Sequence, residues 1–406
     1  MQVPPHRRRW LIVAALFVVT FGISMPLAAY GVFLPIIAET FGWSRGAIST
    51  ALSINLILGG LAGFFVGRMA DRHGPRVMLF LTVGFAGTGF GLVSQVAALW
   101  QLYVLVGLLG GIGMSSFYLL SAATVARWFD DRSGLAIALV LVGFNIGYIV
   151  AGPLAAWLIA RVGWRSAYAT IGFGCACVAV LAASSVRLPR SDEAAALRMA
   201  VTSRVADAPS GVGGLTAREA LTDPRQWCLN GAWLLLGAVI FTVGVHAVPY
   251  VRDHGVSLAA ASLALTAYGI GTVAARLISG ALSDRFGTHA TMRVGYIVEI
   301  VALTMLASGT TPRTLLLAMV LFGVGAATTD TMLVRTIPDV FGLRALGAIM
   351  GILTLGWRSG AATGPAVTGF IYDATGSYAI PFWAAPVAAL LSWILFAAAT
   401  RHPARR

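Results

Sequence analysis

The sequence contains no lysine, only three cysteines and few charges of either sign. Charged residues make up 11% of the 406 residues and hydrophobic residues 58%, whereas a soluble domain has about 25% charged residues. This balance excludes a water-soluble enzyme. The net charge of +13 would suit a nucleic-acid-binding protein, but the arginines that produce it lie in short loops between apolar segments. Cys175, Cys177 and Cys228 fall in apolar segments, so we expect neither a disulfide framework nor a zinc site.

Long apolar runs fill the chain instead. A helix needs about 20 apolar residues to cross a bilayer, and we predict an all-α membrane protein with twelve spans. They are residues 10–38, 47–70, 77–97, 100–126, 134–160, 165–187, 226–251, 257–282, 293–311, 314–337, 346–371 and 378–400. The first run is long and has no evident cleavage site, so we interpret it as a retained span rather than a signal peptide.

The arginines are divided unequally between the two sides of these spans. With both termini on one side, that side receives 21 arginines and the other side five, which are Arg45, Arg161, Arg165, Arg252 and Arg313. Basic residues near span ends stay in the cytoplasm. We therefore expect a multi-pass protein of the cell (inner) membrane with both termini cytoplasmic.

One long polar segment, 188–225, divides the chain into two six-helix bundles, 1–187 and 226–406. We interpret it as a cytoplasmic linker. Within it, Leu215 to Leu221 is expected to form a short helix on the membrane surface, with Arg218 and Glu219 facing water.

The two predicted bundles are related by an internal repeat. The motif Asp71-Arg72-His73-Gly74 recurs as Asp284-Arg285-Phe286-Gly287 at an offset of 213 residues. The same offset relates further pairs of glycines, which are Gly134 and Gly347, Gly143 and Gly356, Gly147 and Gly360, and Gly163 and Gly376. A parallel duplication of this kind places a transport path between the bundles near the bilayer midplane.

The repeated loop carries a resemblance to a known family. Residues 67–76, Gly-Arg-Met-Ala-Asp-Arg-His-Gly-Pro-Arg, resemble the signature loop of the major facilitator superfamily, and residues 280–287 resemble its degenerate copy. The resemblance implies the fold of that superfamily and a gating role for the loop. Its expected gating residues are Gly67, Asp71, Arg72, Gly74, Arg76, Asp284 and Arg285.

Other segments are similar to bacterial monocarboxylate transporters and to the oxalate/formate antiporter group. They are residues 30–35 (Tyr-Gly-Val-Phe-Leu-Pro), 41–45 (Phe-Gly-Trp-Ser-Arg), 127–129 (Arg-Trp-Phe), 246–250 (His-Ala-Val-Pro-Tyr), 252–255 (Arg-Asp-His-Gly) and 275–276 (Ala-Arg). Residues 101–126 contain no arginine, and this absence counts against a drug exporter of the same superfamily, which would carry one there.

An arginine within a membrane span costs several kcal/mol of free energy and is therefore a functional candidate. Arg276 lies eight residues before Asp284, or about 12 Å from the cytoplasmic end of its helix. Tyr268 and Thr272 precede it on the same helix face. A guanidinium keeps its charge and offers paired donors that match a carboxylate, and the resemblance implies a substrate-binding arginine at this position. The alternative is a structural ion pair with a carboxylate on another helix.

Arg358 is the second arginine near the midplane, at the repeat position of Asn145. We expect it to form an intramembrane ion pair with Asp330, which would leave Arg276 to receive an anion. If Arg358 instead faces the cavity, the site has two cations and suits a dicarboxylate.

The remaining candidates are titratable or line the expected path. His246 is a candidate substrate contact and proton carrier, because its charge changes near neutral pH; Asp330 and Asp253 are alternative proton carriers. The resemblance implies that Tyr118 and Phe144 line the cavity, with Asn145 as the adjacent polar group. This chain departs from the family at Thr272, where an acidic or amide residue is usual, and in lacking the lysine of the first span.

The sequence therefore predicts a proton-linked carrier of a small monocarboxylate, such as lactate or pyruvate, that works as a monomer. The nearest alternative is an organic-anion exchanger of the oxalate/formate kind; a drug exporter and a transporter-like sensor are less favoured. We expect a small organic anion, the proton and the lipid bilayer as partners. No catalytic constellation, metal site, cofactor or nucleic-acid partner is expected.

Overall fold

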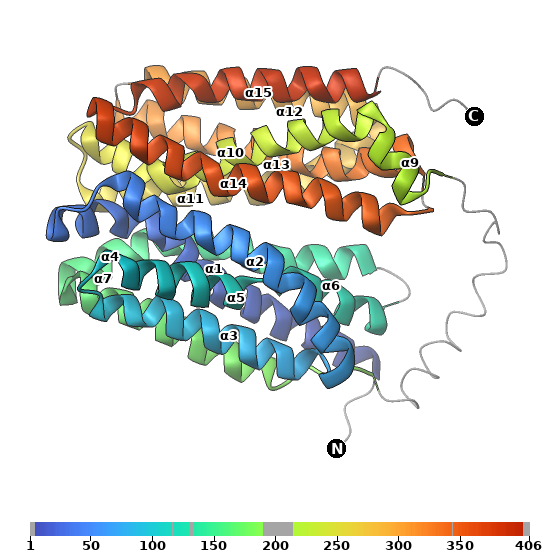
Figure 1. Ribbon diagram of the computed structural model, residues 1–406, viewed down its shortest axis with the longest axis horizontal. Helices are drawn as coiled ribbons and strands as arrows, with labels where there is room; N and C mark the ends of the chain where they lie inside the picture. Colours follow the sequence, from blue (N-terminus) through green and yellow to red (C-terminus); the bar gives the residue numbers. More distant parts are fainter. Residues whose placement is uncertain are drawn as a thin grey trace. The chain divides into compact units, whose positions relative to one another are not determined.

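The computed structural model describes residues 5–115, 117–129, 133–189, 214–309, 311–342 and 344–400. The side chains of Asp71 and Tyr118 lie outside this described part, as do most of the expected linker and the last six residues. In the described ranges, regular structure is helical except for one isolated bridge between Gly214 and Gly342. The predicted all-α class is confirmed (Figure 1).

The helices of the first half follow the expected spans. They are α1 (Pro5–Phe41), α2 (Arg45–His73), α3 (Pro75–Leu92), α4 (Leu99–Leu102), α5 (Gly110–Met114), α6 (Phe117–Trp128) and α7 (Ser133–Ala183). The fourth expected span is interrupted, because a π-helical stretch, Tyr103–Leu109, lies between α4 and α5. The long α7 contains the fifth and sixth expected spans, which are separated at Gly163 by a non-helical φ of 76°.

The described helices of the second half include several that begin at recognisable capping residues. The helices of this half are α9 (Ala217–Thr222), α10 (Pro224–Asp253), α11 (Leu258–Phe286), α12 (Thr288–Ser308), α13 (Pro312–Phe341), α14 (Leu346–Thr375) and α15 (Ala379–Thr400). Asp223, Ser257 and Thr311 each accept a backbone N–H at a helix start, as N-cap side chains do. The short α9 corresponds to the predicted surface helix, and Arg218 and Glu219 are exposed on it.

Nine of the described helices are long and apolar enough to cross a bilayer. That number is lower than the twelve expected spans because three of the expected spans are not counted as separate helices of sufficient length and hydropathy. The stretch Leu135–Ala183 is continuous although it contains two spans, the interrupted segment Leu99–Met114 is shorter, and α14 is not among the nine. Each expected span nevertheless corresponds to a helix, to half of α7 or to the interrupted segment.

The chain forms two compact units that cut across the expected halves. The first unit comprises residues 1–29 and 57–209, and the second comprises residues 30–56 and 210–406. The tip of the first helical hairpin, residues 30–56, therefore belongs with α10 to α15. The reason is direct packing: the hydroxyl of Ser53 donates to the carbonyl of Ala362 on α14, and Gly31 abuts the backbone of Val245 on α10.

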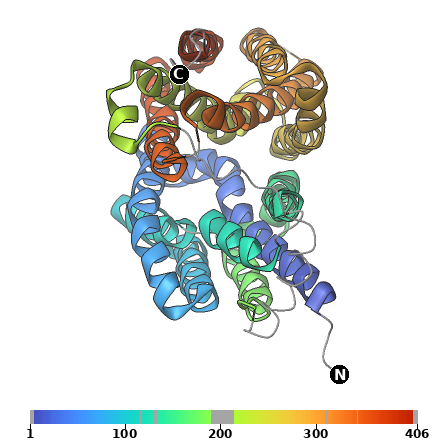
Figure 2. The same cartoon turned by 90° about the vertical axis from the view of Figure 1, so that its right-hand side faces the viewer.

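Within the second unit, α10 packs on α14 and α15, while α11 and α12 pack on α13. In Figure 2 the helices are viewed approximately along their axes. In the first unit, α3 packs on α7.

The internal repeat is visible in the backbone. Gly74 and Gly287, which are 213 residues apart, have nearly identical dihedral angles, with φ of 84° and 87° and ψ of 155° and 154°. Only glycine adopts this conformation readily. Helix contacts repeat as well: Gly147 abuts Phe21, and Gly360 abuts Leu234, again 213 residues further along.

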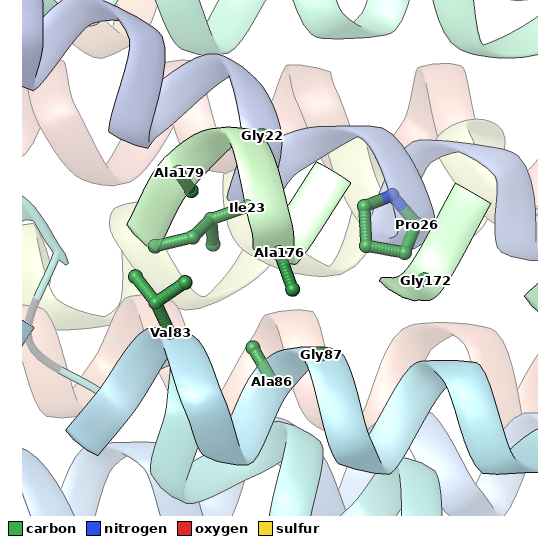
Figure 3. A pocket seen from close by; sticks show the side chains of 9 residues that line it. All are labelled: Gly22, Ile23, Pro26, Val83, Ala86, Gly87, Gly172, Ala176 and Ala179. Atoms are coloured by element: carbon green, nitrogen blue, oxygen red, sulfur yellow. The ribbon is translucent and has the colours of Figure 1, made fainter. Parts of the chain in front are cut away.

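A small pocket lies between α1, α3 and the second half of α7 (Figure 3). Its lining consists entirely of glycine, alanine, proline, valine and isoleucine: Gly22, Ile23, Pro26, Val83, Ala86, Gly87, Gly172, Ala176 and Ala179. No lining side chain can hydrogen-bond. We interpret the pocket as a gap at a small-residue helix contact, because an anion site requires polar donors.

Candidate functional site

Arg276 and Asp330 form an ion pair between α11 and α13. A terminal nitrogen of Arg276 donates to Oδ2 of Asp330 at 3.3 Å. The pair is not sealed, since 32% of the Arg276 side chain and 25% of the Asp330 side chain are exposed. The Nε of Arg276 is buried and has no hydrogen-bond partner among the described residues. The guanidinium of Arg276 thus binds the Asp330 carboxylate through one long hydrogen bond, and its Nε donor is not used by any described residue.

The predicted ion pair between Arg358 and Asp330 is wrong in this structure, because Asp330 is paired with Arg276 instead. Arg358, on α14, donates from Nη1 to the backbone carbonyl of Leu56 at 3.3 Å. In the described ranges, Arg358 forms no salt bridge. Of the two midplane arginines, Arg358 is therefore the one whose charge has no carboxylate.

Tyr268 and Thr272 lie on the face of α11 that meets α13. The ring of Tyr268 stacks on Phe322 with 5.6 Å between centroids, and the Thr272 hydroxyl donates to the backbone carbonyl of Tyr268. Gly323 of α13 lies against the backbone of both residues. Their expected alignment with Arg276 is therefore found, although much of this face is engaged in helix packing.

A further carboxyl group, on α12, contacts the residue of α13 that precedes Asp330. Glu299 of α12 is fully buried, and its Oε2 accepts from the hydroxyl of Thr329, the neighbour of Asp330, at 2.9 Å. Within the part of the chain that the structure describes, its Oε1 has no hydrogen-bond partner. A buried carboxylate without a cation costs several kcal/mol, so we assign the neutral, protonated form to Glu299 in this state.

His246 is fully buried on α10 and uses both ring nitrogens. Nδ1 lies 3.0 Å from the hydroxyl of Tyr378, and Nε2 lies 2.9 Å from the carbonyl oxygen of Pro365. The hydroxyl of Ser49, on the tip of the first hairpin, is 3.4 Å from Nε2. His246 therefore faces the hairpin tip and α14.

Asp253, the other acidic proton-carrier candidate, is engaged by Arg45. The two terminal nitrogens of Arg45 bind its two carboxylate oxygens at 2.8 and 3.1 Å. Arg45 also stacks on the ring of Tyr372 at 3.9 Å. Arg45 and Tyr378 were not among the predicted site residues. The sequence offered two signals for Arg45: it ends the family-like segment 41–45, and it is one of the five arginines on the side that has fewer of them.

The expected cavity residues of the first unit, Phe144 and Asn145, lie on α7. Asn145 is buried, and its amide donates to the carbonyl of Leu141 in the same helix. The ring of Phe144 contacts that of Tyr148 at 5.5 Å. Both therefore stay proposed lining residues, and the side chain of Tyr118 is not described.

The two expected gating loops are tight turns between helices. In the first, α2 ends at His73, Gly74 makes the turn and α3 begins at Pro75, with the Arg76 guanidinium 5.6 Å from the Phe80 ring. In the second, Asp284 accepts from Arg335 of α13 at 2.6 Å. This ion pair ties the end of α11 to α13 at the loop.

These features define a class of protein: a multi-pass helical membrane protein built from a duplicated bundle, with charged residues placed within its spans. A model of the Major Facilitator Superfamily matches residues 14–252 and 246–406. The chain belongs to this family.

Relatives and solved structures agree. The chain is 27% identical to mouse monocarboxylate transporter 11 over 391 residues, covering 92% of this chain and 83% of the relative. It is 25% identical to the oxalate:formate antiporter of Oxalobacter formigenes over 406 residues, covering 93% of each. The crystal structure of a bacterial homolog of the human lysosomal transporter Spinster, inward-facing and unoccupied, matches with a TM-score of 0.77 at 16% identity, covering 97% of both chains. The predicted resemblance to these transporter groups is confirmed.

Proposed function

We propose that the protein carries a small organic monocarboxylate across the membrane by alternating access, with Arg276 and Arg358 as the groups that bind the anion. The names of its relatives support this class of substrate, since they include monocarboxylate transporters, an oxalate:formate antiporter and a gallate transporter of Pseudomonas putida. Tyr118, Phe144, Asn145, Tyr268 and Thr272 stay proposed lining residues.

The observation that carries the proposal is the charge balance within the spans of the second unit. The charges counted are those of two arginines, Arg276 and Arg358, and of one ionised carboxylate, Asp330, which pairs with Arg276. Glu299 is assigned as neutral. The excess is one positive charge, which a single carboxylate neutralises. A monocarboxylate therefore removes the cost of the uncompensated guanidinium, and the fork of an arginine suits its two oxygens.

Transport is proposed to be proton symport in the uptake direction, with His246 as the titratable group. A second candidate is organic-anion exchange. It is favoured by Arg358, which forms no salt bridge with a described residue and so can take part, together with Arg276, in binding a larger anion. We further propose the inner membrane as the location, cytoplasmic termini, a monomeric working unit and a gating role for the loops at Gly74 and Gly287.

The test is uptake of labelled lactate into proteoliposomes under an inward proton gradient. Arg276→Gln and Arg358→Gln should each lower uptake by roughly 10- to 100-fold, the equivalent of one charge-assisted hydrogen bond. Arg293→Gln is the matched control, because Arg293 is exposed on α12 and forms no salt bridge with any described residue. Unchanged uptake in both site variants would contradict the proposal.

The same vesicles separate symport from exchange. Symport predicts that collapsing the proton gradient slows net uptake, whereas exchange predicts rapid counterflow from preloaded vesicles at equal pH on both sides. Transport of an uncharged compound that survives Arg276→Gln would instead support a drug exporter.

A further inference from the structure

The tip of the first hairpin is fastened to α10 and α14 by a group of residues that we call the hairpin latch: Arg45, Asp253, Asp373 and Tyr378. Asp253 binds the Arg45 guanidinium with both oxygens. Asp373 receives the backbone N–H groups of Arg45 and Gly46, one on each oxygen, both at 2.8 Å. These are the first amides of α2, where unpaired donors and the helix dipole favour an anion.

Tyr378 connects this latch to His246. Its hydroxyl oxygen lies 2.9 Å from Nη1 of Arg45 and 3.0 Å from Nδ1 of His246. Arginine can only donate, so the hydroxyl accepts from Arg45 and has its own proton left to give. The carbonyl of Pro365 can only accept, so Nε2 of His246 carries a proton.

These donor and acceptor roles assign one arrangement. His246 is neutral, with its proton on Nε2, and Nδ1 accepts from the Tyr378 hydroxyl. The chain of donors therefore runs from Arg45 to Tyr378, from Tyr378 to His246 and from His246 to Pro365. Every member has its partner only while His246 has a single proton.

A second proton on His246 breaks this chain. Nδ1 becomes a donor, so the Tyr378 oxygen faces two cationic donors and its own proton loses its acceptor. The new positive charge also lies within one hydrogen bond of the hydroxyl that already accepts from the Arg45 guanidinium. We propose that Tyr378 is a positioning residue that couples proton binding at His246 to release of the hairpin latch.

The surroundings of His246 hold both signs of charge. The titratable and charged groups around it are Arg45 on α2, Tyr250 and Asp253 on α10, Tyr372 and Asp373 on α14, and Tyr378 between α14 and α15. Glu39 and Arg252 pair with each other at the same end. The inference rests on the proposed proton symport and names the contacts through which the proton acts.

The latch can be followed without substrate by hydrogen–deuterium exchange of the intact protein. The amides of Arg45 and Gly46 are protected only while they donate to Asp373. After correction for intrinsic exchange, the peptide that contains them should exchange at least about tenfold faster at pH about 4 than at pH about 7.5, because burial and the nearby Arg45 charge oppose a second proton on His246. The absence of this difference in the wild type would overturn the proposal.

Two variants identify the group that binds the proton and the group that couples it to the latch. His246→Gln, which stays neutral, should keep slow exchange at both pH values, and Tyr378→Phe should lose the pH difference. Tyr296→Phe is the matched control, because Tyr296 is a buried tyrosine of the same unit that bonds Ser392; it should keep the wild-type difference. A pH difference that persists in His246→Gln, and so arises from Asp253 or Asp373, would also overturn the proposal.

The two proposals fail separately. If the exchange difference is missing while lactate uptake still depends on Arg276 and Arg358, the latch mechanism is wrong and the proposed function stands. If neither arginine matters for uptake while the exchange difference is present and depends on His246, the latch stands and the substrate assignment is wrong.

Discussion

The carboxylate of Asp330 lies 3.3 Å from a terminal nitrogen of Arg276, so the acidic group of α13 neutralises the arginine of α11. Asp330 is therefore not paired with Arg358, which donates a hydrogen bond to the backbone carbonyl of Leu56. The charge available for an anion depends on this one carboxylate, and changing it should alter which anion is carried.

Replacing Asp330 with asparagine should shift preference from monocarboxylates toward dicarboxylates. The change removes the only ionised carboxylate assigned to the spans of the second unit and leaves two arginines, which together match two negative charges. Oxalate uptake relative to lactate uptake should rise by roughly tenfold or more, since about 1.4 kcal/mol of altered pairing has that effect. Asp339→Asn is the matched control, because Asp339 lies exposed on the same helix; an unchanged ratio in Asp330→Asn would contradict the charge argument.

Glycine 360 should be far less replaceable than Gly351 on the same helix. A Cβ at Gly360 would overlap the backbone of Leu234, whereas a Cβ at Gly351 meets nothing. We expect Gly360→Ala to destabilise by about 1–3 kcal/mol through overpacking and Gly351→Ala to be neutral or stabilising by up to about 1 kcal/mol. Thermal unfolding in detergent measures both, and equal melting temperatures would refute the close contact between α10 and α14.

The start of α10 should respond to acid through Asp223. The Arg225 guanidinium, followed by the Arg225 backbone N–H, binds this carboxylate and lowers the pKa of Asp223 below its usual value. A lowered pKa contributes stability that is present above the unfolded value of about 3.9 and is lost as the pH falls through the folded value. Asp223→Asn should therefore be less stable than wild type at pH 7, by less than about 1 kcal/mol because the pair is partly exposed.

Melting temperatures measured between neutral and strongly acidic pH check this prediction. The difference between wild type and Asp223→Asn should shrink as the pH drops below the usual aspartate range. A difference that stays constant with pH would mean that the charge of Asp223 does not cause it and would contradict the prediction.

The spans were predictable because they depend on local composition. About 20 apolar residues between charged breaks form a helix in a bilayer wherever they occur. Helices accordingly cover the expected segments, although the fourth is interrupted and the fifth and sixth are joined in α7. The repeat was predictable for a similar reason. Gly74 and Gly287 recur in the sequence because the same turn geometry recurs in the fold.

The pairing of charges was not predictable. Arg276, Arg358 and Asp330 were all recognised, yet which arginine meets Asp330 depends on the packing of α11 on α13, which no periodicity specifies. The latch was missed for the same reason, because Arg45, Asp253 and Asp373 are brought together from positions more than a hundred residues apart. The grouping of residues 30–56 with the second unit likewise follows from these nonlocal contacts.

The charge balance within the spans depends on whether Glu299 is neutral or ionised, and Glu299→Gln tests which form is present. If Glu299 is neutral, glutamine replaces it with the same shape and charge, and the Thr329 hydroxyl keeps an oxygen acceptor. Stability should then change by less than about 1 kcal/mol, and lactate uptake should stay within about twofold of wild type. The infrared carbonyl band of a protonated carboxylic acid should be present in the wild type and missing from the variant.

If Glu299 were ionised and balanced a buried arginine, its loss would instead cost about 3–5 kcal/mol by leaving that cation unpaired. Such a loss, without the infrared band, would remove the excess positive charge on which the monocarboxylate assignment depends.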